Sequence, residues 1–107
     1  MSEAESMLDQ LALAHEKLLL ASPDPISATG LEEVRKGLLA ELSRIGPQRL
    51  GQRPLPDEWS AKEVMEHLVA HDNKHQEIET RGLGHYVEHG RTHIDQLAQI
   101  GRLLGNA

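Results

Sequence analysis

Two near-copies of one histidine pattern stand close together in the sequence: His67-Leu-Val-Ala-His71-Asp-Asn-Lys-His75 and His85-Tyr-Val-Glu-His89-Gly-Arg-Thr-His93. In each copy a histidine recurs every fourth residue, and residues four apart lie on one face of an α-helix. Gly82 and Gly84 stand between the copies and predict a turn. We therefore expect two consecutive antiparallel helices whose histidines face each other.

The turn would bring the two copies together level by level. The facing pairs would be His67 with His93, His71 with His89, and His75 with His85. The rival interpretation is one unbroken helix over residues 60–104, in which the 18-residue offset between the copies is five full turns and keeps the histidines on one face. The paired glycines and the length of such a helix favour the turn.

Apolar residues at helical spacing predict two further helices before the histidines. The first is expected over residues 2–21, followed by a linker over residues 22–28. The second is expected to begin at Thr29, because Thr29-Gly-Leu-Glu32 has the form of a capping box. Ser60-Ala-Lys-Glu63 is a second capping box and predicts the start of the third helix. The fourth should run from about residue 83 or 85 to residue 104.

These elements predict an all-α, antiparallel four-helix bundle in a single domain over residues 1–107. The residues expected to face its core are Leu8, Leu11, His15, Leu18 and Leu19; Leu31, Val34, Leu38, Leu42 and Ile45; Val64, His67, Leu68, His71, His75 and Ile78; and Tyr86, His89, His93, Leu97, Ile100 and Leu104. The chain has one Trp, one Tyr and no Phe, so its core has few large rings, and we expect a homodimer to complete it.

Composition excludes several classes of function. The net charge of −6 argues against a nucleic-acid surface and against a polybasic membrane surface. The absence of cysteine excludes disulfides and thiolate chemistry and fits a cytoplasmic protein. No apolar run is long enough to span a membrane, and the acidic N-terminus lacks the basic region of a signal peptide.

A divalent metal site is the leading hypothesis for the histidines, because buried imidazoles need partners for their polar atoms. Two histidines four residues apart can bind one ion, and a third from the facing helix leaves further positions open to water or substrate. Spacing alone leaves two solutions, His67 with His89 and His93, or His67 and His71 with His93. His71 is therefore expected to be a ligand, a residue that orients a ligand, or a core residue.

Simpler interpretations suit the other candidates. His15 stands alone on the first helix and is expected to be an ordinary core histidine, whereas His75 and His85 lie nearest the turn and are expected to be solvated. Gly90 inside the fourth helix should cost about 1 kcal/mol relative to Ala, which is tolerable where bulk is unwelcome, for instance beside an ion. Four acids near the histidines could orient imidazoles, but a solvated helix face is the preferred interpretation for each. They are Glu66, Asp72, Glu88 and Asp95.

The stretch Trp59-Ser60-Ala-Lys-Glu63-Val64-Met-Glu-His67-Leu68 resembles the second-helix signature of the DinB-like (YfiT-like) metal-dependent hydrolase superfamily. His89-Gly-Arg-Thr-His93-Ile-Asp-Gln96 is similar to its last-helix signature. The resemblance covers residues 29–107 and implies a four-helix bundle. It also implies a divalent ion, zinc or nickel, on His67, His89 and His93. Residues 1–28 would be an extra N-terminal helix and linker, and the family's third helix would have no counterpart.

The resemblance implies a metal-dependent hydrolase or a thiol-dependent S-transferase acting on a small molecule or a low-molecular-weight thiol. The sequence identifies no catalytic side chain and no site for an organic cofactor. The alternative is a non-catalytic helical dimerisation module, in which the histidines form a structural or pH-sensitive seam.

Overall fold

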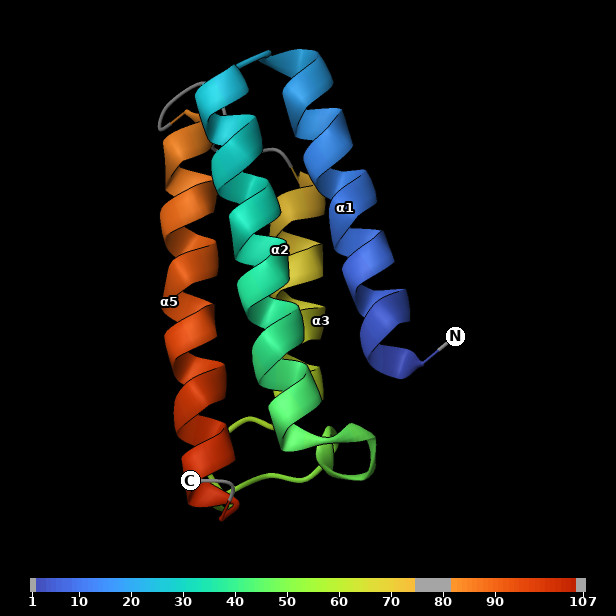
Figure 1. Ribbon diagram of the computed structural model, residues 1–107, viewed down its shortest axis with the longest axis vertical. Helices are drawn as coiled ribbons and strands as arrows, with labels where there is room; N and C mark the ends of the chain where they lie inside the picture. Colours follow the sequence, from blue (N-terminus) through green and yellow to red (C-terminus); the bar gives the residue numbers. More distant parts are fainter. Residues whose placement is uncertain (1, 75–81, 106–107) are drawn as a thin grey trace.

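The computed structural model describes residues 2–74 and 82–105. They form four α-helices, α1 (Glu3–Ala21), α2 (Pro25–Ile45), α3 (Ala61–Lys74) and α5 (Leu83–Leu103), and one short 3-10 helix, η1 (Pro47–Arg49). Consecutive helices run in opposite directions (Figure 1). The predicted all-α four-helix bundle is therefore confirmed, and the described residues contain no strand.

The helix start predicted at Thr29 is wrong, because α2 begins four residues earlier, at Pro25. Asp24 caps this helix by accepting hydrogen bonds from the backbone N–H groups of Ile26 and Ser27, at 3.1 and 3.3 Å. Proline suits the first helical position because the N–H that it lacks would have no partner there. The Thr29 hydroxyl instead donates to the carbonyl of Pro25 within the helix, so the linker after α1 is shorter than expected.

The capping box predicted before α3 is present. Ser60 Oγ accepts from the Glu63 N–H at 3.2 Å, and Glu63 Oε1 accepts from the Ser60 N–H at 3.0 Å. Arg53 donates to both Glu63 oxygens, at 2.9 and 2.7 Å. The hydrogen bonds from Arg53, and then those from Ser60, lower the pKa of the Glu63 carboxyl to about 2. The start of the helix that carries His67 is thus fixed by a local polar network.

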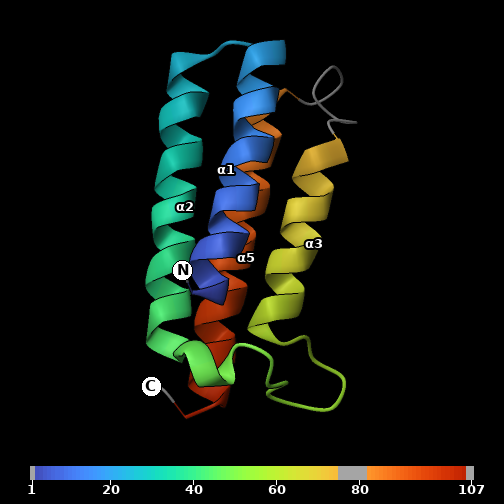
Figure 2. The same ribbon diagram turned by 90° about the vertical axis from the view of Figure 1, so that its right-hand side faces the viewer.

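The bundle contains two pairs of parallel neighbours. The segment after α2 runs across the end of the bundle to reach α3 (Figure 2), so α3 packs on α1 and α5 packs on α2. The two pairs meet where α1 packs on α2 and where α3 packs on α5. The contacts between α2 and α5 are more extensive than those between α3 and α5, and the histidines occupy this smaller interface.

Glycines set the approach of α2 to α5. A Cβ atom on Gly90 would lie 2.5 Å from Val34 Cγ1, and one on Gly37 would lie 2.7 Å from Ile94 Cδ1. The Val34 side chain thus occupies the space beside Gly90. This packing explains why a glycine stands there, and no bound ion is needed to explain it. Close packing of this kind resists rotation of α5 about its own axis. It thereby holds the helix face that carries His89 and His93 toward α3.

Most of the predicted core is buried. Relative exposure is below 10% for Leu8, Leu11, His15, Leu18, Leu31, Val34, Leu38, Leu42, Ile45, Val64, Leu68, Tyr86, His93, Leu97 and Ile100. Leu19 and Leu104 are only partly buried and pack at the edge of the core, whereas His75 and Ile78 lie outside the described residues. In the described part of the chain, no helix combines the length and apolar character needed to cross a membrane.

Candidate metal centre

His67 of α3 meets His89 and His93 of α5 at the interface between the two helix pairs. Each of these three histidines offers one nitrogen, and the three nitrogens all lie within 4.8 Å of one another. The His67 ring centroid is 5.5 Å from that of His89 and 5.1 Å from that of His93. This contact between α3 and α5 excludes an unbroken helix over residues 60–104, because one straight helix would separate these rings by many turns.

The closest nitrogen pair has the spacing of two ligands on one ion. His89 Nε2 and His93 Nε2 are 3.1 Å apart. Nitrogens bonded to the same ion at about 2.0–2.1 Å, with angles of about 90–110°, are separated by about 2.9–3.4 Å. The pair therefore needs little rearrangement to accept a shared cation. Without a cation, one of the two rings donates a hydrogen bond to the other.

A hydrogen bond to Gln96 fixes the tautomer of His93. The Nδ1–H group of His93 donates to Gln96 Oε1 at 2.7 Å, because a carbonyl oxygen can only accept. In the neutral ring the lone pair is then on Nε2, which faces His89. Histidines that bind metals commonly donate their other N–H in this way, and Gln96 lies one helical turn beyond His93.

Burial favours the neutral form of the α3 and α5 imidazoles that face each other. Desolvation lowers the pKa of His89 to about 4, and repulsion by His71 and His93 adds to the effect. Desolvation also lowers the pKa of His67, with further contributions from His93 and His71. A metal binds the deprotonated ring, so both shifts favour coordination at neutral pH.

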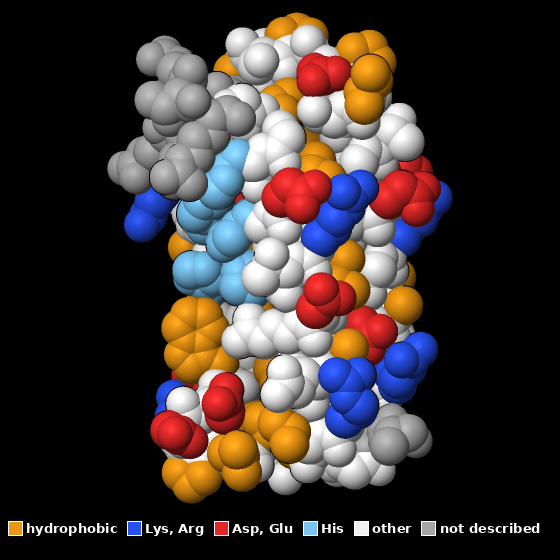
Figure 3. All heavy atoms as spheres, turned by 90° about the vertical axis from the view of Figure 1, so that its left-hand side faces the viewer, with side chains coloured by type: hydrophobic (Ala, Val, Ile, Leu, Met, Phe, Trp, Pro, Cys, Tyr) orange, Lys and Arg blue, Asp and Glu red, His pale blue; other side chains and the backbone are white. Residues whose placement is uncertain are grey.

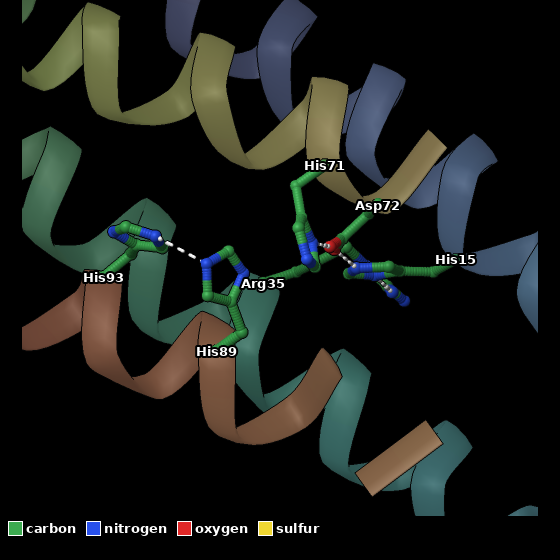
Figure 4. A network of polar contacts seen from close by, with 6 residues as sticks. All are labelled: His15, Arg35, His71, Asp72, His89 and His93. Carbon is green, nitrogen blue, oxygen red and sulfur yellow. Dashed lines mark hydrogen bonds and ion pairs between the residues drawn. The ribbon is translucent and has the colours of Figure 1, made fainter. Parts of the chain in front are cut away.

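A second series of polar contacts links α2 and α1 to the histidines (Figure 4). Arg35 Nη1 donates to His15 Nδ1 at 2.7 Å, and His15 Nε2–H donates to Asp72 Oδ2 at 2.8 Å. Asp72 Oδ1 accepts from His71 Nδ1–H, also at 2.8 Å. The guanidinium cannot accept and the carboxylate cannot donate, so their contacts make His15 a neutral Nε2–H tautomer.

Asp72 was expected on a solvated helix face, and that expectation is wrong. Its side chain is only 1% exposed, because it continues the core stripe of α3 that passes through Met65 and Leu68. His15 is buried as predicted, at 1% exposure. His15 and Asp72 each lie on the apolar stripe of their helix. This shared position is the sequence signal that could have predicted their pairing. The other three nearby acids, Glu66, Glu88 and Asp95, are exposed as expected.

The histidines lie at the surface as well as at the interface. Figure 3 shows histidine side chains as a continuous strip on the face that includes α5. His67, His71, His85 and His89 are partly buried, so solvent reaches parts of the strip. The indole of Trp59 lies beside it, with its ring centroid 5.1 Å from that of His67. Ligands from solution thus have access to the cluster.

The structure separates the two ligand sets that spacing left open. Among the described residues, the sets with mutually close donor atoms are His67 with His89 and His93, and His71 with Asp72 and His89. The alternative set of His67, His71 and His93 is not one of them. His71 instead contacts His89, with ring centroids 4.1 Å apart, and it belongs to the second set.

Fold and side chains together define a helical bundle with a histidine cluster that could hold a metal ion. Comparisons of the chain with protein-family models, with curated proteins and with solved structures give no match. The DinB-like resemblance of the two helix signatures therefore stays a prediction.

Proposed function

We propose that this protein is a DinB-like helical bundle that binds one divalent ion, zinc or nickel, through His67, His89 and His93. The observation that carries the proposal is the 3.1 Å separation of the Nε2 atoms of His89 and His93, with His67 facing both from α3. The hydrogen bond from His93 to Gln96 supports it, because it directs the lone pair of Nε2 into the cluster.

Three protein ligands leave at least one coordination position for water or substrate. A divalent ion there would lower the pKa of a bound water or thiol and polarise a substrate. We propose metal-dependent hydrolysis or thiol S-transfer on a small molecule as the reaction class. The chain itself contributes neutral imidazoles, the Gln96 carbonyl that orients one of them, and the partly exposed surface beside Trp59 through which a substrate approaches.

Metal analysis of the untagged full chain tests binding. We expect uptake of Zn²⁺ or Ni²⁺ with a rise in Tm, and strong loss of affinity in His93→Gln. His85→Gln is the matched control, because His85 lies one turn before His89 on α5 but belongs to neither ligand set. No uptake by the wild-type chain on titration would reject the proposal.

Activity is tested separately, on the metal-loaded protein. Ester substrates and thiol-transfer probes are assayed with the wild-type chain and with His93→Gln. Turnover that appears with the metal and disappears in the variant would support an enzyme. Metal-dependent stability without turnover would support the second candidate, a non-catalytic module whose histidines form a structural seam.

One observation favours that second candidate. The two helix pairs, α1 with α3 and α2 with α5, meet at α3 and α5 through a set of imidazole contacts. An ion bound by His67 and His93 would cross-link the pairs and stabilise the bundle directly. Under this function, removal of the ion lowers Tm but abolishes no reaction.

We also propose that the chain forms a homodimer. Large apolar side chains on α1 and α2 are exposed, among them Leu13 at 59%, Leu20 at 77% and Leu39 at 41%. Burying them against a second copy would remove apolar surface from water. Light scattering coupled to size exclusion should give twice the monomer mass, and Leu13→Glu with Leu20→Glu should shift it to the monomer. A monomeric wild-type chain would reject this proposal.

A further inference from the structure

The second ligand set lies directly beside the first and shares one residue with it. His71, Asp72 and His89 each offer a donor atom, and these atoms lie within 4.8 Å of one another. Its chemistry is two imidazoles and one carboxylate, which suits transition metals with open coordination positions. The set draws on α3 and α5, as the first set does.

The donor atoms of His71 and Asp72 are spaced like two ligands of one ion. His71 Nδ1 and Asp72 Oδ1 are 2.8 Å apart, and donors bonded to one ion at about 2.1 Å and nearly at right angles lie about 3 Å apart. The other oxygen of Asp72 already accepts a hydrogen bond from His15. A carboxylate oriented in this way is the usual supporting arrangement of a metal ligand.

The shared histidine has one nitrogen for each set. His89 Nε2 faces His93, and Figure 4 shows the second ring nitrogen on the side of His71 and Asp72. This second nitrogen, Nδ1, is buried and has no hydrogen-bond partner among the described residues. A buried polar atom without a partner costs about 1–3 kcal/mol, so its position requires an explanation that the first site does not give.

We propose that His71, Asp72 and His89 form a second cation site, and that the imidazole of His89 bridges the two ions. The inference rests on the proposed first site, because the bridge needs an ion on His89 Nε2. The second ion binds His89 Nδ1, and the proton of that ring leaves to solvent. The proton that His71 Nδ1 shares with Asp72 moves to His71 Nε2, so one proton is released in total.

The charge of Asp72 supports a cation in this position. The Asp72 carboxylate carries one negative charge, the deprotonated His89 ring would share its charge between the two ions, and His71 stays neutral. Asp72 is 1% exposed and lies in the core, where an uncompensated charge is costly. A divalent cation beside it offsets that charge more directly than the contact through His15 to Arg35 does.

Stoichiometry is the first test, measured by Zn²⁺ titration calorimetry and metal analysis on the untagged full chain. We expect two Zn²⁺ per wild-type chain and per His85→Gln chain. We expect one Zn²⁺ in Asp72→Asn and one in His93→Gln. Should Asp72→Asn fail to fold, His71→Gln replaces it, because His71 is 23% exposed and its loss leaves the Asp72–His15 contact intact.

Magnetic coupling is the second test and reports on the bridge itself. Two Cu²⁺ ions joined through one imidazolate couple antiferromagnetically, so the doubly loaded wild-type chain should show less paramagnetic resonance signal than its copper content predicts. His71→Gln loaded with one Cu²⁺ should show the full signal. A full signal from two wild-type coppers would overturn the bridge.

The outcomes separate this inference from the function on which it rests. One ion per wild-type chain, lost in His93→Gln and unaffected by Asp72→Asn, would overturn the second site and leave the first intact. No ion in any variant would overturn both. Two ions whose number is unchanged in Asp72→Asn and in His71→Gln would also overturn the second site.

Discussion

His15 of α1 donates a hydrogen bond to Asp72 of α3 at 2.8 Å, across 57 positions of sequence, and each residue is only 1% exposed. Asp72 also accepts from His71, which packs against His89. The N-terminal helix is thereby joined to the histidine cluster through one carboxylate. This contact makes α1 part of the support of the candidate metal centre.

Removal of the Asp72 carboxylate should destabilise the fold. Asp72→Ala leaves the N–H groups of His15 and His71 without their acceptor, and we expect the free energy of unfolding to fall by about 2–3 kcal/mol. Urea denaturation of the metal-free protein measures it. Asp95→Ala, which removes an exposed acid from α5, is the control and should change stability by less than about 0.5 kcal/mol. Equal effects in the two variants would show that the buried network contributes little.

Gln96 should support metal binding through His93 without touching the ion. Gln96→Ala removes the acceptor for His93 Nδ1–H, and loss of such a partner typically lowers metal affinity by about 10–100-fold. Competition with a coloured chelator gives the affinity. Gln99 lies on the same helix at an exposed position, so Gln99→Ala is the control and should bind the metal with wild-type affinity. Unchanged affinity in Gln96→Ala would contradict the assigned tautomer of His93.

Adding a side-chain atom at Gly90 should lower the stability of the fold. In Gly90→Ala the new methyl group would lie 2.5 Å from Val34 Cγ1, and overpacking typically costs about 1–3 kcal/mol. Alanine's better helix propensity offsets about 1 kcal/mol of this. Gly84→Ala is the matched control, since no atom lies within 4 Å of its added Cβ, and it should be neutral or stabilising. We expect Gly90→Ala to unfold at lower urea than Gly84→Ala does, and the reverse order would reject the packing argument.

The metal-free protein should lose stability on acidification. Burial lowers the pKa of His89 from about 6.5 to about 4, so between these values the unfolded chain binds more protons than the folded chain does. The free energy of unfolding therefore falls as the pH drops from about 6.5 and levels off, for this group, below about 4. Thermal unfolding in the presence of EDTA measures the slope.

The control for this pH dependence is His89→Gln, which lacks the titrating group. Carboxylates also titrate near pH 4, so the informative quantity is the difference in slope between the wild type and this variant. We expect a shallower slope for His89→Gln between pH 6.5 and 4. Identical slopes would mean that the folded state does not depress the pKa of His89.

The sequence by itself determined the helices and the facing of the histidines. Helical spacing predicted the core stripes, and Ser60 with Glu63 predicted the start of α3, because capping and periodicity are local properties. Gly82 and Gly84 predicted a turn; Gly82 caps the start of α5, Gly84 lies inside that helix, and residues 75–81 lie outside the described part of the chain. The start of α2 was misplaced because Asp24-Pro25 is also a strong start signal, and the Thr29–Glu32 pattern was given more weight.

Only the tertiary structure decided which three histidines bring their nitrogens close together and which side chains support them. α2 packs on α5 with Val34 fitted against Gly90, and this rotational setting cannot be read from the period of either helix. Asp72 looked like one more acid near the histidines until α1 brought His15 to it. Contacts between residues far apart in the chain depend on how whole helices pack, and local sequence carries little information about that.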